Sequence, residues 1–175
     1  MTPGKPSQFR VTGIDHIYIT VSDLRRSEKF YDRVMRFLGF RKGTGPIEGE
    51  PHRHYYNRDL QLTLRPAHGI KPPHDPYAPG LHHICLRVSD RQAVDAAARG
   101  LRRLKIEVTR PQLYPQYGPD YYAIFFVDPD GIRLEIVNHL ARRREIRRVW
   151  NMLEEFVDPL QKLRARASRK TGGSR

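Results

Sequence analysis

The chain has 175 residues, of which 38% are hydrophobic and 29% charged, a balance typical of one folded domain or two small modules that share a core. No apolar segment approaches the roughly 20 residues that span a bilayer, and the first residues lack the apolar stretch of a secretory signal. A single cysteine excludes an internal disulfide framework and a cysteine-rich zinc module. We therefore expect a soluble cytoplasmic protein that does not bind membranes.

The chain repeats itself at an offset of 67 residues, because the segment IDHIYITVSD at 14–23 returns as LHHICLRVSD at 81–90. Each copy alternates apolar and polar residues, which predicts a strand, and ends in Ser-Asp, which predicts a helix N-cap. Helical patterns follow in both copies, and each is followed by strand-like segments. These lie near residue 40, at 54–57 and at 60–65 in the first copy, and at 106–109, 121–127 and 132–138 in the second.

Both copies are therefore predicted to be βαβββ modules, at about residues 12–65 and 81–140. Residues 66–80 hold five prolines and are predicted to be a linker. A lone βαβββ unit would leave one sheet face bare. We therefore expect an α+β domain over residues 1–140, in which two paired modules form a cupped mixed sheet around a cavity.

Strand alternation assigns polar side chains to the faces that would line this cavity. His16, His83 and Glu135 all fall on these faces, whereas His82 falls on a helix-packing face. Two imidazoles and one carboxylate that leave open coordination positions are typical of mononuclear Fe(II) sites, and Mn(II) also accepts them. The alternative is that the two histidines are ordinary polar residues at strand starts and that Glu135 pairs with an arginine.

These residues, together with the stretch YAIFFVDPDGIRLE at 122–135, resemble the vicinal oxygen chelate superfamily over about residues 12–140. The superfamily includes glyoxalase I, extradiol dioxygenases, fosfomycin-resistance enzymes, methylmalonyl-CoA epimerase and bleomycin-binding proteins. The resemblance implies one divalent metal ion, with Fe(II) or Mn(II) favoured, bound by His16, His83 and Glu135. Thr63 occupies the family's remaining ligand position and is a weak ligand, so a three-ligand site is expected. Both single-chain cavities and domain-swapped dimers occur in the family, and the sequence leaves this choice open.

The resemblance implies an enzyme that acts on a small vicinally oxygenated substrate, and extradiol-type dioxygenase chemistry is the first expectation. His68, in the linker, is the candidate acid–base residue, although Phe125 stands where extradiol enzymes tend to carry a tyrosine. One alternative is a lyase, isomerase or thiol transferase that works through a metal-bound enediolate. The other is a non-catalytic antibiotic-binding protein, which the net charge of +13 disfavours because binders of the cationic drug bleomycin have acidic surfaces.

Three further residues, Thr63, Arg87 and Arg133, are predicted to line the cavity and are candidate substrate-binding residues. Inward-facing arginines favour an anionic, oxygen-rich ligand. The alternative is that the arginines pair with Glu135 or with surface carboxylates.

Residues 141–175 form a basic tail that holds +7 of the chain's +13 net charge. Its apolar residues recur at three- and four-residue spacing from Ile146, which predicts an amphipathic helix that breaks near Pro159. We expect this stripe to pack on its own chain or, more favourably, in a homodimer interface, because an exposed stripe would promote aggregation. A nucleic-acid or membrane-surface arm is disfavoured because the aromatic residues lie on the stripe and not among the basic residues. The stripe consists of Val149, Trp150, Leu153, Phe156, Val157 and Leu160.

Overall fold

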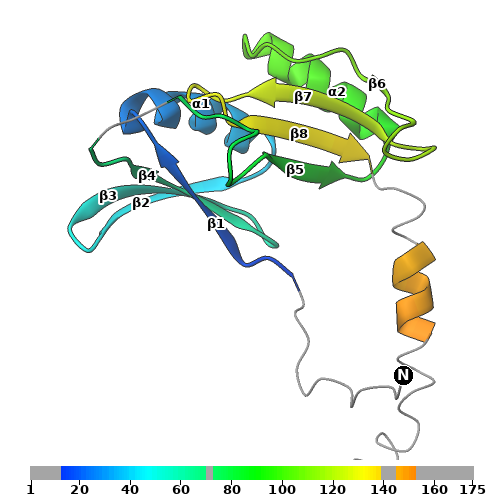
Figure 1. Cartoon of the computed structure of the whole chain (residues 1–175), viewed down its shortest axis with the longest axis horizontal. Helices are drawn as coiled ribbons and strands as arrows, with labels where there is room; N and C mark the ends of the chain where they lie inside the picture. The colour runs from blue at the N-terminus through cyan, green and yellow to red at the C-terminus, as the bar shows by residue number, and fades with distance from the viewer. Residues whose placement is uncertain (1–12, 70–72, 139–144, 153–175) are drawn as a thin grey trace, which may run out of the picture.

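The computed structural model describes residues 13–69, 73–138 and 145–152, and the predicted order of elements appears twice (Figure 1). The first module consists of β1 (His16–Val21), α1 (Leu24–Phe37), β2 (Arg41–Ile47), β3 (Glu50–Tyr56) and β4 (Gln61–Pro66). The second consists of β5 (His83–Val88), α2 (Arg91–Arg103), β6 (Gln112–Leu113), β7 (Tyr122–Val127) and β8 (Arg133–Asn138). A short helix covers residues 145–152. The predicted α+β fold of two βαβββ modules and a C-terminal helix is confirmed.

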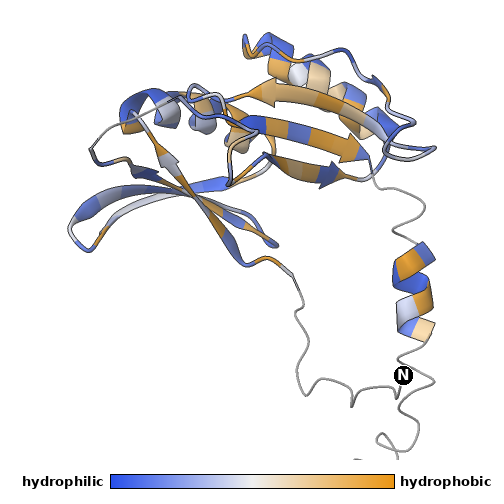
Figure 2. Cartoon of the chain, viewed as in Figure 1, coloured by the Kyte–Doolittle hydropathy of each residue, from blue (hydrophilic) through white to orange (hydrophobic). Residues whose placement is uncertain are grey.

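Each module forms its own four-stranded mixed sheet, in the orders β1-β4-β3-β2 and β5-β8-β7-β6. The first and last strands of each module pair in parallel, and this places Thr63 beside Tyr18 and Glu135 beside Cys85. The hydropathy of β7 and β8 makes the second sheet the more apolar of the two (Figure 2), and almost all of β8 is buried. The predicted faces are confirmed in β1, where exposed His16 alternates with residues packed toward the core.

The repeated Ser-Asp pair starts both helices as predicted. The Asp23 carboxylate accepts a hydrogen bond from the Arg26 backbone N–H at 3.0 Å, and the Asp90 carboxylate accepts one from the Ala93 N–H at 2.8 Å. Such caps satisfy backbone donors that have no partner within the helix. Each helix then buries one stripe, formed by Phe30, Tyr31, Val34 and Met35 in α1 and by Val94, Ala97, Ala98 and Leu101 in α2.

Two strand predictions differ from the structure. Strand β3 begins earlier than predicted, at Glu50 and not at residue 54. Glu48 and Gly49 adopt positive φ values of 50° and 81° and close a tight turn between β2 and β3 within a polar, glycine-rich segment. The prediction of a strand at 106–109 is wrong, since those residues are irregular and β6 is only two residues long. Thr109 instead uses its backbone N–H and its hydroxyl to bond the backbone of Phe125.

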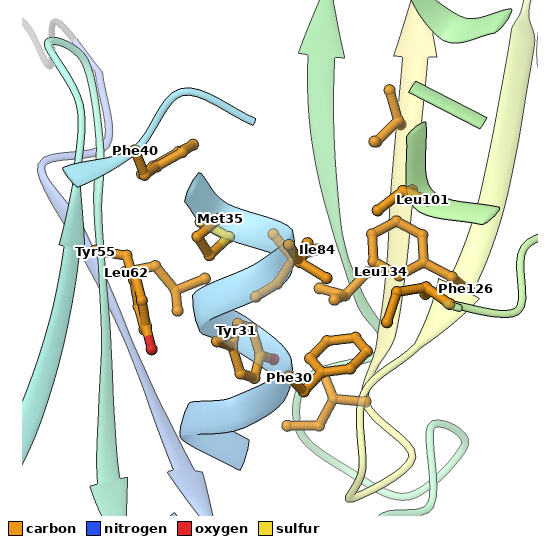
Figure 3. Close-up of a cluster of buried hydrophobic side chains, with 14 of the residues drawn as sticks. Phe30, Tyr31, Met35, Phe40, Tyr55, Leu62, Ile84, Leu101, Phe126 and Leu134 are labelled. Atoms are coloured by element: carbon orange, nitrogen blue, oxygen red, sulfur yellow. The ribbon is translucent and has the colours of Figure 1, made fainter. Parts of the chain in front are cut away.

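Helix α1 lies between the two sheets and belongs to one continuous core (Figure 3). Its Phe30 ring lies 6.5 Å from that of Phe126 on β7, with the distance measured between ring centroids. Gly100 of α2 allows a close approach of the Phe37 ring of α1, because a Cβ at Gly100 would lie 1.9 Å from that ring. The modules therefore meet through their helix-packing faces. The other face of each sheet lies on the far side from this core.

The turn at 128–131 joins β7 to β8 and anchors the second module on the first. Asp130 accepts hydrogen bonds from the Ser22 backbone N–H at 3.2 Å and from the Arg26 guanidinium at 2.7 Å. The Ser27 hydroxyl donates to the same carboxylate at 3.2 Å, and the Ser22 hydroxyl also donates to it. One partly buried carboxylate thus connects the turn to the end of β1 and the first turn of α1.

The Asp130→Ala substitution is expected to lower the free energy of unfolding by about 2–3 kcal/mol, because it leaves several donors without their shared acceptor. Urea unfolding followed by circular dichroism measures the change. Glu107→Ala removes an exposed carboxylate and is the control, with an expected change within about 0.5 kcal/mol. A loss for Asp130→Ala no larger than that of the control would show that the turn does not anchor the modules.

The C-terminal helix at 145–152 exposes the start of the predicted apolar stripe. The side chains of Ile146, Val149 and Trp150 are all exposed, and their spacing places them on one helix face. The rest of the stripe, from Leu153 to Leu160, lies outside the described residues. No helix in the described part of the chain is long and apolar enough to cross a membrane.

Candidate metal centre

Glu135 is a buried carboxylate in the middle of β8, with 2% of its surface exposed. The parallel neighbour β5 brings His83 to it, so that His83 Nε2 lies 3.3 Å from Glu135 Oε2. Tyr121, immediately before β7, donates a hydrogen bond from its hydroxyl to Glu135 Oε1 at 2.5 Å. Burial, and then this hydrogen bond, raise the pKa of Tyr121 well above its ordinary value. The hydroxyl therefore keeps its proton and remains a donor.

The surroundings of Glu135 fit a divalent metal ion. A buried carboxylate normally needs a cation or several donors to offset its lost hydration. In the described part of the chain Glu135 has no arginine partner, and Arg133 instead approaches His82, with 3.5 Å between Nη1 and Nε2. An imidazole and a carboxylate are suitable ligands, and a phenol that orients the carboxylate is a typical outer partner of a metal site.

His16 does not join this pair within one chain. Its side chain is 52% exposed, and its Nδ1 lies 2.8 Å from the Asp15 carboxylate. Over the ranges that the structure describes, no three His, Cys, Asp or Glu side chains gather as metal ligands would. Because α1 lies between the sheets, the face that carries His16 and the face that carries His83 both lie away from the shared core.

The other predicted site residues lie in different surroundings. Thr63 is fully buried on β4, and Arg87 is exposed on β5. Arg133 is half-buried beside His82. His68, the candidate acid–base residue, is 65% exposed and bonds Glu50 of its own module, with 2.5 Å between Nε2 and Oε1. The structure thus brings together His83 and Glu135 but leaves the remaining candidates apart from them.

Two histidines of β3, His52 and His54, were not singled out from the sequence. They lie on the same face of the first sheet as His16, and their rings stack with centroids 6.1 Å apart. Their alternate spacing is the signal that identifies a shared face. The sequence analysis missed this pair because the predicted strand began at residue 54 and so left His52 outside it, whereas β3 begins at Glu50.

The profile of the Glyoxalase/Bleomycin resistance protein/Dioxygenase superfamily matches residues 13–136. The chain belongs to this superfamily. It is 28% identical over 126 residues to the uncharacterized protein YqjT of Bacillus subtilis (strain 168), a match that covers 70% of this chain and 95% of that protein.

Two solved structures share the superfamily fold. A glyoxylase/bleomycin resistance protein/dioxygenase domain from Frankia sp. EAN1pec is 23% identical with a TM-score of 0.62, over 75% of this chain and 100% of that one. A mutant of the fosfomycin resistance protein FosX from Listeria monocytogenes, complexed with Mn(II) and 1S,2S-dihydroxypropylphosphonic acid, is 17% identical with a TM-score of 0.54. That match covers 77% of this chain and 96% of FosX. At these identities the likeness shows the fold alone.

The Tyr121→Phe substitution is expected to weaken divalent-metal binding about tenfold, because Glu135 loses the donor that orients its carboxylate. Titration with Mn(II), followed by the electron paramagnetic resonance of the free ion, gives the dissociation constant. Tyr117→Phe is the matched control, because the Tyr117 ring lies 5.2 Å from that of Tyr121 but it is the Tyr121 hydroxyl that donates to Glu135. Equal affinities in wild type and Tyr121→Phe would exclude this orienting role.

Proposed function

We propose that the protein is a mononuclear metal enzyme, in which His83 and Glu135 of one chain and His16 of a second copy bind one Fe(II) or Mn(II) ion. The observation that carries the proposal is the buried Glu135 carboxylate beside His83, at 3.3 Å and without an arginine partner among the described residues. Membership of the superfamily supports the same ligand set, because the sequence resemblance assigns its metal-binding positions to these three residues.

In a homodimer, the second copy supplies the His16 ligand that one chain does not bring to His83 and Glu135. Each chain offers two separate half-sites, one carrying His16 and one carrying His83 with Glu135. In a twofold-symmetric dimer, the first module of each copy faces the second module of the other, and two equivalent sites result. This arrangement is favoured over a single-chain cavity because α1 occupies the space between the two sheets of one chain.

The substrate is proposed to be a small, vicinally oxygenated and anionic molecule. The bound ion would act as a Lewis acid and as a template for two neighbouring substrate oxygens. The protein side of the site contributes positive charge, because Arg87 is exposed on β5 on the same face as His83 and Cys85. Extradiol-type dioxygenation is the first candidate reaction.

A second candidate, a lyase, isomerase or thiol transferase, is favoured by the surroundings of Phe125. The ring of Phe125 packs edge-on against that of Tyr114, with centroids 5.1 Å apart, so a phenyl group fills the place where extradiol enzymes tend to carry a tyrosine.

Oxygen consumption separates these reactions, since only the dioxygenase needs O2. The experiment is anaerobic reconstitution with Fe(II), followed by oxygen uptake with a panel of catechols and 2-oxo acids. Turnover of a panel compound without oxygen uptake would support the second candidate. Metal content below about a tenth of an equivalent after purification without chelators, with no gain on reconstitution, would support a non-catalytic binding protein instead.

His16→Ala and Glu135→Ala are each expected to lose nearly all bound metal, because each lacks one ligand. When the two variants are refolded together, about one quarter of the wild-type metal content should return, because each mixed dimer regains one complete site. Mass spectrometry of bound metal gives the content. His82→Ala is the control and should keep its metal.

Two outcomes of the mixing experiment would contradict the proposal. No recovery in the mixture would indicate that the ligands come from one chain. Loss of metal in His82→Ala, combined with full metal in His83→Ala, would overturn the assignment of the faces of β5.

Deletion of residues 141–175 is expected to cause dissociation of the dimer or insolubility, because the apolar stripe that begins at Ile146 is proposed to pack in the dimer interface. Exposure of Ile146, Val149 and Trp150 in one chain supports this role. Light scattering after size-exclusion chromatography measures the mass. A soluble truncated protein of unchanged oligomeric state that loses only polyanion binding would favour the nucleic-acid or membrane arm.

A further inference from the structure

The first sheet carries polar side chains that the proposed metal site does not use. On the face that carries His16, the sheet register places His54 of β3 directly beside Thr63 of β4, and Tyr18 of β1 beside Thr63. Since neighbouring strands lie about 4.8 Å apart, His54 stands about 10 Å across the sheet from β1. This separation is within reach of a small molecule bound near His16.

A chain of hydrogen bonds fixes the protonation of His54. Gln61 Nε2 and His54 Nδ1 each lie 3.0 Å from the hydroxyl oxygen of Thr63, which is fully buried. An amide nitrogen only donates, so the Thr63 oxygen accepts from Gln61. Among the described residues His54 Nδ1 is the one acceptor within reach of the buried Thr63 hydroxyl, so we assign the hydroxyl proton to the bond with His54 Nδ1. His54 Nδ1 must then be an unprotonated acceptor, and the ring proton is on Nε2.

The surroundings of His54 keep its ring neutral. Burial lowers the pKa of His54, and the adjacent His52 ring lowers it further. His52 has the opposite tautomer, because its Nδ1 lies 2.9 Å from the backbone carbonyl oxygen of Glu50, which only accepts. The two stacked imidazoles thus hold their protons on different nitrogens, and His54 is the one whose Nε2 is the donor.

We propose that His54 is a substrate-binding residue, whose Nε2–H donates a hydrogen bond to an anionic oxygen of the ligand held at the metal centre. The inference rests on the proposed function, because the pairing of two copies would bring His54 of one chain to His83 and Glu135 of the other. Thr63, at the family's remaining ligand position, acts here as a positioning residue for His54.

Other groups near this face are already engaged. Arg65 Nη2 lies 3.2 Å from Glu50 Oε2, so this cation is paired within its own module. His68 bonds the other oxygen of the same carboxylate. A neutral imidazole donor that is held in one tautomer loses little freedom when it binds an oxygen anion, and a hydrogen bond to a charged acceptor is stronger than one to a neutral acceptor.

The tautomer is measured without any metal or ligand. Long-range nitrogen–proton spectra of the histidine rings at pH 7 should show His54 with its proton on Nε2 and His52 with its proton on Nδ1. Thr63→Val keeps the shape of the side chain but removes the hydroxyl, so His54 should then populate both tautomers. A proton on Nδ1 of His54 in the wild type would overturn the inference.

Binding is measured with 4-nitrocatechol, which offers two neighbouring oxygens and changes its absorption on chelation, added to the Mn(II)-loaded protein. His54→Phe is expected to weaken this probe about fivefold without changing Mn(II) affinity, because one hydrogen bond to the ligand is lost. His54→Gln keeps an N–H donor and should bind with intermediate affinity. Glu107→Gln changes an exposed side chain that has no role in the proposed site, so it is the control and should bind like the wild type.

The outcomes separate this inference from the proposed function. Equal probe affinity in His54→Phe and the wild type, with Mn(II) bound in both, would overturn the role of His54 and leave the metal site standing. A wild type that binds neither Mn(II) nor the probe would overturn the proposed function and, with it, the ligand-binding role of His54.

Discussion

Helix α1 packs against both sheets at once, and this shared position determines where every candidate ligand lies. Tyr31 of α1 contacts both modules. Its ring lies 6.2 Å from that of Tyr55 in the first module, measured between ring centroids, and its hydroxyl donates a hydrogen bond to Asp128 of the second module at 3.0 Å. Burial, and then Asp128, raise the pKa of Tyr31, so the hydroxyl remains a donor. Because the apolar face of each sheet is used on the helix side, the polar faces are left to point away from the core.

The polar faces of the two sheets carry different candidate ligands of the proposed metal site. The second module holds a buried carboxylate with its imidazole and phenol partners, and the first holds an exposed imidazole and a row of polar side chains. In the proposed dimer these parts complement each other, since Glu135 has no arginine or lysine partner among the described residues and the exposed His16 contacts only side chains next to it, Asp15 and Tyr18, within the same part of the chain. In this proposal the cost of burying Glu135 is offset in part by the Tyr121 hydroxyl within one chain, and the bound metal ion would offset the rest.

Much of this arrangement could be predicted from the sequence, because it depends on local rules. The 67-residue repeat and strand alternation were enough to place His83 and Glu135 on one face, and Ser-Asp was enough to start both helices. Alternation within a strand does not determine how two sheets are turned relative to each other, so the separation of His16 from that pair could not be predicted. His54 was missed because the polar hairpin of β2 and β3 lacks the apolar pattern that marks a strand.

In the proposed dimer, metal binding and assembly depend on each other. An ion that needs His16 from one copy and Glu135 from the other binds only the assembled protein, so it stabilises the dimer by mass action. The same linkage applies to the substrate, since the metal and the His54 donor reach it from different chains. A monomer then has neither a complete metal site nor a complete substrate site, and dilution removes both together. If the proposal holds, the position of α1 between the sheets, which keeps the two half-sites of one chain apart, is what makes the function depend on association.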